Sequence, residues 1–432
     1  MKPHSTYDLI IIGAGISGLM ALRHALKAKL NVLCLEKAGD VGGLWRDLPD
    51  WQDLQIRKED WAINGTPVQS EFRKDIHENI KTIVDKYSLR SHIQFQTQVQ
   101  GLQHKNDDWT VLTKQGEFKA KNIIIATGLH HSPVTPEVQR NQSSITEYHS
   151  SNFFDPSVLA NKKVTIVGGG SSAYDCLELA LKHKAKEIHW VYRSTKWFIP
   201  HRGRMKYQVA GLRRLAWTQM LGFSTDQQNK MANQLLGFLY KKNGVEEIKP
   251  KTPFDYLSQQ IIAGRPVFVK NFNSIHKHNG EIKKLEGTKV FLNHENFETD
   301  ILLWGTGYKL DLSWTGLEAY KNLSTSSEIR KKLGSFFVSL DYPHLYFTGV
   351  SILDSNSTAP LLFSIITRSL ISEIKGTCTL PRTPIHHFIN HWDMIKFLSK
   401  HDRANYFPFF WKIKYFFKAL YYFIFQNRQI SI

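Results

Sequence analysis

Cysteine is scarce in this chain, and the few cysteines present are widely separated. There are 3 cysteines in 432 residues, at Cys34, Cys176 and Cys378, and none belongs to a C-x-x-C pair. A redox-active disulfide of that kind is therefore excluded, and an isolated cysteine in a buried strand or helix is ordinarily a small hydrophobic residue. Because disulfides are rare in reducing compartments, this usage favours a cytoplasmic protein.

Long uncharged hydrophobic runs and an N-terminal signal are also lacking. No apolar stretch is long enough to predict a membrane-spanning helix. The first buried strand begins by Asp8, which leaves no room for a signal peptide and again predicts a cytoplasmic location. With 42% hydrophobic residues the chain has enough apolar material for real cores, and its length suggests two domains.

Acidic residues are too few to balance the basic ones. Lys and Arg number 56 and Asp and Glu number 38, which gives a formal net charge of +18. Such an excess favours anionic partners such as phosphates, acidic lipid or nucleic acid, although a general contribution to solubility explains it about equally well. Of these partners, nucleic acid is not expected for this chain.

The chain does contain a glycine-rich turn between two buried strands. An apolar run of strand length leads into the pattern G-x-G-x-x-G at Gly13, Gly15 and Gly18, and a helical pattern follows. One glycine permits the tight turn, one admits a pyrophosphate, and one lets the helix pack on the strand. The next buried strand ends in Glu36, an acid placed to hold ribose hydroxyls. These features predict a site for a dinucleotide without a 2′-phosphate.

The same pattern occurs a second time. A strand leads into Gly168, Gly170 and Ala173 in a G-x-G-x-x-A turn, but the strand after its helix ends in Arg193 and Ser194. An acid there would repel a 2′-phosphate, whereas an arginine and hydroxyls would bind one. The second site is therefore predicted to take NADPH and the first FAD. The duplication predicts an α/β fold with two dinucleotide-binding (Rossmann-like) domains, the NADPH domain inserted into the FAD domain.

Domain boundaries follow from this duplication. The prediction assigns residues 1–160 to the first part of the FAD-binding domain, 161–308 to the NADPH-binding domain with an insertion at about 197–245, 309–400 to the return of the FAD-binding domain, and 401–432 to an aromatic and basic C-terminal segment. Residues 266–271 and 289–292 read as strands that resume the second nucleotide sheet after the insertion.

The C-terminal segment is rich in aromatic residues and carries Lys412, Lys414 and Lys418. Lysines make a membrane-spanning helix unfavourable, whereas aromatic rings and long lysine stems suit a membrane interface. The segment is thus the candidate for a peripheral membrane contact. A helix docked on the protein's own core, or a subunit contact, is the alternative, and an oligomer is left open.

Shorter motifs lie between and after the two turns. Residues 42–46 read Gly-Gly-Leu-Trp-Arg, and two strands end in Thr-Gly, at residues 126–128 and 305–307. Together and in this order, the motifs resemble those of the flavin-containing monooxygenase family over roughly residues 5–375. The resemblance implies an FAD- and NADPH-dependent monooxygenase. Such an enzyme inserts one oxygen atom from O2 into a small nucleophilic N- or S-containing substrate through a flavin C4a-(hydro)peroxide.

The turns and motifs supply the candidate site residues. The predicted cofactor-binding residues are Gly13, Ala14, Gly15, Ser17, Gly18, Glu36, Lys37, Gly43, Leu44, Trp45, Val99, Ala126, Thr127, Gly128, Gly168, Gly170, Ser171, Ser172, Arg193, Ser194, Thr306 and Gly307. Trp45, Arg57 and Tyr207 are the catalytic candidates, expected to line the reaction site. No metal site is predicted, because the pair His130-His131 has no further ligand at suitable spacing.

The chain departs from the family pattern at two places. In the identifying pattern F-x-G-x-x-x-H-x-x-x-[F/Y], His149 and Phe153 match, but Ser143 and Ile145 replace Phe and Gly. Arg57 stands where family members often have Asn. These departures keep open an NADPH oxidase or a redox-sensing FAD/NADPH protein without productive oxygenation. A Baeyer–Villiger-type monooxygenase is a further alternative, although Phe153 in place of Trp leans away from that branch.

Overall fold

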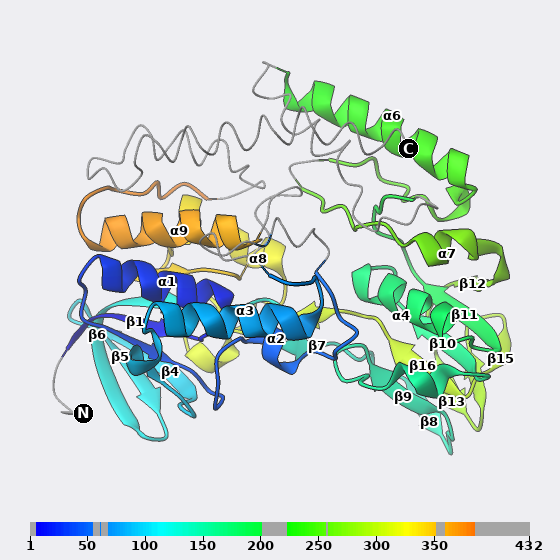
Figure 1. The fold of residues 1–432 in the computed structure, drawn as a ribbon, viewed down its shortest axis with the longest axis horizontal. Helices are drawn as coiled ribbons and strands as arrows, with labels where there is room; N and C mark the ends of the chain where they lie inside the picture. Colours follow the sequence, from blue (N-terminus) through cyan, green and yellow to red (C-terminus); the bar gives the residue numbers. More distant parts are fainter. Residues whose placement is uncertain are drawn as a thin grey trace. The chain divides into compact units, whose positions relative to one another are not determined.

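The chain folds into two compact units in a computed structural model that describes residues 6–54, 61, 68–200, 223–255, 258–350 and 359–384 (Figure 1). Among the described residues, unit 1 comprises those up to Ser132 together with those from Lys309 onward, and unit 2 comprises those from Pro133 to Tyr308. Unit 2 is thus inserted into unit 1 along the sequence. The first boundary differs from the expected one, because strands within residues 133–160 pair with the sheets of unit 2.

Within the described residues, a seven-stranded sheet of order β3-β2-β1-β6-β5-β4, with β18 also paired to β6, organises unit 1. Its strands are β1 (Tyr7–Ile12), β2 (Val32–Leu35), β3 (Ile93–Gln94), β4 (Val99–Lys105), β5 (Asp108–Thr113), β6 (Gly116–Ile125) and β18 (Leu345–Phe347). β1, β2, β3, β18 and the second half of β6 are parallel, whereas β4 and β5 form an antiparallel meander with the first half of β6. The parallel strands end along one edge, where ligands bind in such sheets.

Helices pack on this sheet with one apolar face each. The helices of unit 1 are α1 (Ile16–Lys27), α2 (Leu44–Asp47), α3 (Arg73–Lys86), α8 (Ser326–Arg330) and α9 (Ala359–Ile374). α1 and α9 lie side by side (Figure 1). On α3 the buried residues include Ile76, Ile80 and Ile83, whose spacing gives the helix its apolar stripe. The same apolar spacing predicts a helix over residues 71–87 from the sequence, and α3 confirms it.

Unit 2 holds a parallel sheet of order β12-β11-β10-β16-β9 and a smaller sheet of order β15-β14-β13-β8. The parallel strands are β9 (Thr146–His149), β10 (Lys163–Val167), β11 (Glu187–Tyr192), β12 (His276–Asn279) and β16 (Ile301–Trp304). The small sheet contains β8 (Gln139–Asn141), β13 (Lys284–Glu286), β14 (Lys289–Phe291) and β15 (Asn296–Glu298). Each unit therefore has its own parallel sheet, and the prediction of two dinucleotide-type α/β folds is confirmed.

The helices of unit 2 begin and end at recognisable signals. They are α4 (Ser171–Lys182), α6 (Thr225–Asn243) and α7 (Pro266–Lys270). α6 begins with a capping box between Ser224 and Gln227 and ends at Gly244, whose φ of 68° lies in the left-handed region. The sequence predicts a helix over residues 227–242, and α6 confirms it.

The expectation of a strand at residues 266–271 is wrong, because this segment forms α7. Pro266 occupies the first turn, where its missing N–H costs nothing. A Glu178 carboxylate oxygen accepts from the backbone N–H groups of Val267 and Phe268, at 2.8 and 3.2 Å, and so caps the helix from α4. The strand beside β11 is instead β12. The strand at residues 289–292 exists as β14, but it pairs with β13 and β15 in the small sheet.

The chain passes between the units at two places, and the two crossing segments pair with each other. β7 (Ser132–Pro133) and β17 (Tyr308–Lys309) form a two-stranded sheet. The remaining short elements are 3-10 turns at Arg90–His92, Pro156–Leu159, Glu246–Ile248, Phe272–Ser274, Ser313–Thr315 and Ser335–Phe337.

Membrane-spanning helices were not expected from the sequence. Across the described part of the chain, every helix is too short or too polar to cross a bilayer. The aromatic segment 401–432 and much of the predicted insertion, residues 201–222, lie outside the described residues.

Candidate functional site

The first glycine-rich turn joins β1 to α1 and is held by close backbone approaches. Gly13 has a φ of 107°, which disfavours any side chain, and its N–H donates to the Leu35 carbonyl at 2.8 Å. A Cβ on Gly18 would lie 1.9 Å from the Gly13 carbonyl oxygen. Gly15 is the N-cap of α1 and has no side-chain cap. The helix therefore begins with backbone N–H groups and a positive dipole end suited to a pyrophosphate.

The loop of residues 40–46, which runs into the start of α2, packs directly on this turn. The Gly42 N–H donates to the Ala14 carbonyl at 3.1 Å. A Cβ on Gly43, which has a φ of 53°, would lie 3.0 Å from the Gly15 Cα. The two backbones thus touch at the point where the predicted pyrophosphate approaches. Gly-Gly at this position is required by contact as well as by the loop's positive φ values.

Glu36 follows β2 and is buried beside the same turn. One carboxylate oxygen accepts from the Ala14 N–H at 2.7 Å, and the other accepts from the Ala38 N–H at 2.9 Å. Arg46 places a guanidinium nitrogen 3.7 Å from the second oxygen, which offsets the cost of burying the charge. A carboxylate has about four lone-pair sites, so two remain for ribose hydroxyls.

The ends of β6 and β18 complete this edge of unit 1. Thr127 follows β6 and Thr348 follows β18, and both hydroxyls are buried with no hydrogen-bond partner among the described residues. A buried hydroxyl without a partner is costly, so these groups fit a ligand that supplies the missing bond. Gly349, with a φ of 72°, lies against the Ser17 hydroxyl, since a Cβ there would be 2.6 Å from that oxygen. The residues of this edge therefore fit a bound dinucleotide.

The second turn, between β10 and α4, repeats the arrangement in unit 2. Gly168 has a φ of 130°, and its N–H donates to the Val191 carbonyl at 2.9 Å. A Cβ on Gly169 would lie 1.8 Å from the Ser194 carbonyl oxygen, so the end of β11 rests on the turn. Gly170 is the N-cap of α4, and a Cβ there would meet no atom of the described residues within 4 Å. This open face fits a phosphate approaching the helix N-terminus.

Arg193 stands at the end of β11, as expected for a residue that reads a 2′-phosphate. Its side chain is 78% exposed and makes an ion pair with Glu281 at 3.2 Å. Glu281 also pairs with Lys283 at 3.2 Å, and the hydrogen bonds from Lys283 and Arg193 lower the pKa of Glu281. Because exposed ion pairs are weak, the guanidinium is available to a stronger anion. Ser194 is exposed beside it.

His149, at the end of β9, is fixed by hydrogen bonds on both ring nitrogens. Its Nε2–H donates to the Gly307 carbonyl at 3.1 Å, and its Nδ1 accepts from the Ser151 N–H at 3.1 Å. Burial lowers the pKa of His149, although the bond to Gly307 opposes this. Thr306 donates to the Val134 carbonyl, so residues 306–307 are tied to both β9 and the crossing segment. Both ring nitrogens of His149 are therefore held by hydrogen bonds within unit 2.

The remaining site predictions are spread over the two units. Ala126 is buried where β6 ends, and Gly128 has a φ of 80°. Leu44 and Trp45 lie on α2, and the Trp45 ring meets Trp61 edge-on at 5.5 Å between centroids. Ser171 and Ser172 begin α4.

Two further cofactor candidates differ in exposure. Val99 is buried at the start of β4, two residues after a backbone bond from Thr97 to Glu36. Lys37 is exposed and helps to lower the pKa of His131, after burial as the larger cause. Arg57 and Tyr207 lie outside the described residues, so the catalytic candidates are represented by Trp45 alone.

Sequence reasoning missed several residues that shape these sites. The sequence predicts Thr348 only as the end of a strand over residues 345–348. Its buried hydroxyl, which has no partner among the described residues, has no sequence signal. His77 and Arg73 on α3 contact the 40–46 loop. Because residues four apart lie on one face of a helix, this spacing could have indicated a shared polar face. The sequence prediction of this helix used only its apolar residues.

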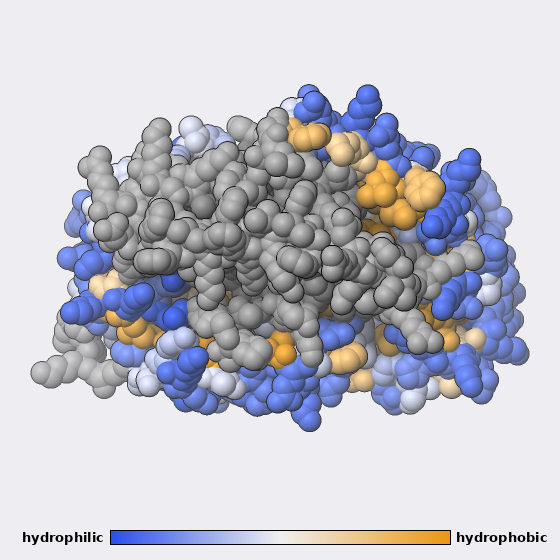
Figure 2. Space-filling view, turned by 45° about the horizontal axis from the view of Figure 1, so that its top comes forward, coloured by the Kyte–Doolittle hydropathy of each residue, from blue (hydrophilic) through white to orange (hydrophobic). Residues whose placement is uncertain are grey.

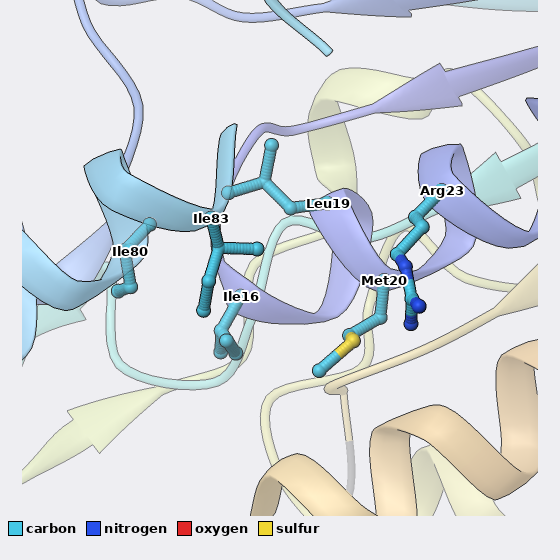
Figure 3. A pocket seen from close by; sticks show the side chains of 6 residues that line it. All are labelled: Ile16, Leu19, Met20, Arg23, Ile80 and Ile83. Atoms are coloured by element: carbon cyan, nitrogen blue, oxygen red, sulfur yellow. The ribbon is translucent and has the colours of Figure 1, made fainter. Parts of the chain in front are cut away.

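A small apolar pocket between α1 and α3 is too small to be a substrate site (Figure 3). Its volume is about 10 Å³, no more than one water molecule requires. It is lined by Ile16, Leu19, Met20, Arg23, Ile80 and Ile83. The pocket is therefore a packing gap between two helices.

Metal and thiol chemistry find no support in the described residues. Among them, no group of three or more His, Cys, Asp or Glu side chains could hold a metal ion. The structure describes all three cysteines, and none of them forms a disulfide. Burial raises the pKa values of the Cys34 and Cys176 thiols strongly. The expectation that these two are buried small hydrophobic residues is confirmed.

Comparison with known proteins agrees with this geometry. A family model described as pyridine nucleotide-disulphide oxidoreductase matches residues 10–220. Flavin-containing monooxygenase 5 of Cavia porcellus is 25% identical over 420 residues, which cover 86% of this chain and 74% of that protein. A flavin-containing monooxygenase structure from Stenotrophomonas maltophilia superposes with a TM-score of 0.61 at 17% identity, covering 87% of this chain and 100% of that one. A complex of OTEMO with FAD and NADP gives a TM-score of 0.65 at 15% identity, covering 87% of this chain and 86% of that one.

The two strand–turn–helix units and their glycine contacts define the class of two-domain oxidoreductases with paired dinucleotide folds. None of the three cysteines forms a disulfide or belongs to a C-x-x-C pair, so the disulfide chemistry in the family model's description has no counterpart in this chain. Within the class, the chain resembles the flavin-containing monooxygenases in sequence, and its fold is similar to theirs. The resemblance drawn from the sequence is confirmed.

Proposed function

We propose that this protein is an FAD- and NADPH-dependent monooxygenase, with FAD in unit 1 and NADPH in unit 2. The observation that carries the proposal is the contrast between two otherwise similar glycine turns. The first turn is followed by the buried acid Glu36, and the second by the exposed base Arg193. An acid suits ribose hydroxyls and a base suits a 2′-phosphate, so the two sites address different dinucleotides.

The chain's own residues have defined tasks in this proposal. The N-terminus of α1 and the backbones of Gly15 and Gly43 bind the pyrophosphate of FAD, and Glu36 binds its ribose. Thr127 and Thr348 donate or accept the hydrogen bond that the described residues leave unmade. In unit 2, Gly170 with Ser171 and Ser172 binds the NADPH pyrophosphate. Bound flavin supplies the redox and oxygen-transfer chemistry.

The finer part of the proposal concerns the substrate. By family resemblance, bound FAD would supply the oxygen-transfer chemistry, and the substrate would be a small nucleophilic N- or S-containing molecule. Trp45 is half-buried on α2 beside the flavin turn and would help to exclude water there. Arg57 and Tyr207 are proposed as further lining residues. The protein needs no nucleophile triad or acid–base pair for this chemistry, and none was predicted from its sequence.

A second candidate function rests on the departures from the family pattern at Ser143, Ile145 and Arg57. Ile145 is buried in the core of unit 2, where the family's glycine would leave more room. An NADPH oxidase or a redox-sensing FAD/NADPH protein would not need the oxygen-holding site intact. A Baeyer–Villiger-type reaction is the remaining alternative within the family.

Stopped-flow absorbance of the reduced protein mixed with O2 separates these functions. A band at about 370 nm that persists before the oxidised spectrum returns supports the monooxygenase, following the known chemistry of bound flavin. Direct return to the oxidised spectrum with stoichiometric hydrogen peroxide would contradict it and favour the oxidase. NADPH consumption measured over amines, sulfides and ketones, corrected for peroxide, then distinguishes the substrate classes.

We further propose a peripheral membrane contact through residues 401–432. Apolar side chains also reach the surface on α6, where Met231 and Phe238 are 38% and 59% exposed. Figure 2 shows hydrophobic side chains among hydrophilic ones on the surface. Lys242 lies 5.7 Å from the centre of the Phe238 ring, a pairing of base and aromatic suited to anionic headgroups. Deleting residues 405–432 should release the protein from anionic liposomes in flotation, and failure of the full-length chain to float at low salt would disprove the contact.

A further inference from the structure

Three basic side chains on one face of α3 point to the loop of residues 40–46. Arg73, His77 and Lys81 are spaced by four residues, so they lie one above another along the helix. Each of the three contacts a different part of that loop. The apolar stripe by which the sequence predicts this helix lies beside the basic face.

His77 and Arg73 hold the two ends of the loop through its carbonyl groups. The His77 Nε2–H donates to the Val41 carbonyl at 3.0 Å, and the His77 side chain is buried. Arg73 donates to the Arg46 carbonyl and pairs with Asp50 at 3.2 Å. A ring nitrogen facing a carbonyl must carry the proton, so the His77 contact forms with either the neutral Nε2–H tautomer or the imidazolium.

Lys81 acts on the start of the loop through Asp40. Its ammonium lies 4.0 Å from the Asp40 carboxylate, and Arg90 lies 3.0 Å from the other oxygen of that group. The same carboxylate accepts from the Val41 N–H at 2.8 Å. The bonds to the Val41 N–H and to Arg90 lower the pKa of Asp40, although desolvation opposes them. The charge on Asp40, and with it the turn at Val41, is thereby maintained.

The other side of the loop meets the first glycine-rich turn. Gly42 donates to Ala14, Gly43 lies against Gly15, and Arg46 lies close to Glu36. Gly42 is also the position where a Cβ would lie 2.7 Å from the His77 ring, so the loop is in contact with the helix on its other side. α3 is thus one step removed from the groups that would touch the dinucleotide.

We propose that the basic face of α3 positions the 40–46 loop for FAD, with His77 and Arg73 as positioning residues. This inference rests on the proposed function of unit 1. The two donors fix both ends of the loop before the ligand binds. Less conformational entropy is therefore lost on binding, which makes the binding free energy more favourable. Their contribution should therefore be seen in FAD affinity rather than only in stability.

The test uses the full-length protein stripped of flavin and reconstituted with FAD. His77→Phe keeps a ring but removes the donor, His77→Gln keeps a donor, and Arg73→Met removes the guanidinium. Lys74→Met is the matched control, since Lys74 is an exposed base on the same helix. FAD dissociation constants come from flavin fluorescence, and unfolding midpoints of the flavin-free proteins and NADP⁺ affinities are measured in parallel.

We expect His77→Phe and Arg73→Met each to weaken FAD binding by about tenfold, the effect of one lost hydrogen bond, with NADP⁺ affinity unchanged. His77→Gln should recover most of the affinity, and Lys74→Met should match the wild type. In a double variant the losses should not add, because both residues hold one loop.

Two results would overturn the inference. One is wild-type FAD affinity in both His77→Phe and Arg73→Met. The other is a drop in the unfolding midpoint of the flavin-free variants with no change in FAD affinity, which would make α3 merely structural. A wild-type protein that fails to bind FAD at all would instead reject the proposed function.

Discussion

The glycines of the first turn differ in what they tolerate, although they share one motif. A Cβ on Gly18 would collide with a backbone carbonyl, whereas a Cβ on Gly15 would meet only the Gly43 Cα among the described residues, at 3.8 Å. A side chain at Gly18 therefore forces the backbone apart. A side chain at Gly15 fills the place of the ligand. Gly18 is therefore required for folding, and Gly15 is expected to be required for binding the ligand.

Gly15→Val should give a folded protein without FAD, because the valine blocks the pyrophosphate while α1 keeps its contacts. Gly18→Ala should lower the free energy of unfolding by about 3 kcal/mol, the cost of an overpacked backbone contact. Flavin absorbance after purification and chemical denaturation curves measure the two effects. Full FAD occupancy in a folded Gly15→Val variant would refute the assignment of this turn.

Arg193 is the residue on which cofactor choice is expected to depend. Arg193→Ala should raise KM for NADPH by roughly tenfold, the lower end for a charged hydrogen bond to phosphate, because the side chain is exposed. KM for NADH should change little. Steady-state kinetics with both cofactors decide the point, and equal losses with NADPH and NADH would make Arg193 structural.

Glu281 offers a matched variant for that experiment. It pairs with Arg193 and would compete with a 2′-phosphate for the guanidinium. Glu281→Gln should therefore leave KM for NADPH unchanged or lower it. A rise comparable to that of Arg193→Ala would show that the ion pair itself organises the site.

At the scale of elements, β11 and β12 carry a histidine cluster that makes unit 2 sensitive to acid. His189 Nε2 lies 3.0 Å from Glu187, and its Nδ1 lies 3.0 Å from His278. His278 in turn pairs with Glu295, and His276 lies 3.7 Å from Glu187. Burial is the main cause that lowers the pKa of His189 to about 4, with the neighbouring histidines adding to it and Glu187 opposing it.

This lowered pKa predicts how stability depends on pH. In the unfolded chain His189 is protonated below its ordinary pKa of 6.5. In the folded protein its pKa is about 4, so it stays neutral down to that pH. Stability should therefore fall as the pH drops from 6.5 towards 4. His189→Asn should remove about 1–2 kcal/mol of that fall, after allowance for solvent screening. Urea unfolding at pH values of about 7.5, 6 and 5, which start above this window and enter its upper part, measures the dependence. An unchanged slope of stability against pH in the variant would contradict the assignment.

The elements that sequence could predict are those whose signal is local. The β1–α1–β2 and β10–α4–β11 units each combine an apolar run, a glycine turn and a helix, so their order was evident. The turn glycines and Glu36 were assigned for the same reason. Residues 266–271 have equally apolar character, but Pro266 and the distant cap from Glu178 make them a helix. That carboxylate is far away in sequence, so no local pattern reveals it.

Pairing between remote segments was also beyond the sequence. Strand β9 joins unit 2 through its ladder with β16, which moves residues 133–160 out of the predicted first domain. Thr348 became a site candidate only because its hydroxyl is buried without a partner in the described part of the chain. The proposed role of the basic face of α3 follows from its contacts with the 40–46 loop. In each case the information lies in contacts, which a single sequence does not display.

For the molecule as a whole, the cysteines predict a simple thiol titration. Cys34 and Cys176 are fully buried with strongly raised pKa values, whereas Cys378 is half-buried. Native protein should thus react with a disulfide reagent at no more than one thiol, and denatured protein at all of its 3 cysteines. Absorbance of the released thiolate counts them. Rapid reaction of Cys34 or Cys176 in the native state would contradict this prediction, because it would require local unfolding around a fully buried thiol.

The pairing of β7 with β17 makes unit 2 a removable cassette. The chain leaves unit 1 at Ser132 and re-enters it at Lys309, in two segments that are hydrogen-bonded neighbours. A gene that joins these two points directly, without residues 133–308, asks the backbone to span no more than the gap between paired strands. The described core of unit 1 draws on both flanking segments and on none of the excised one. Such an excision should leave a minimal flavin carrier, and the cassette would have its own two termini side by side, ready for grafting into another host.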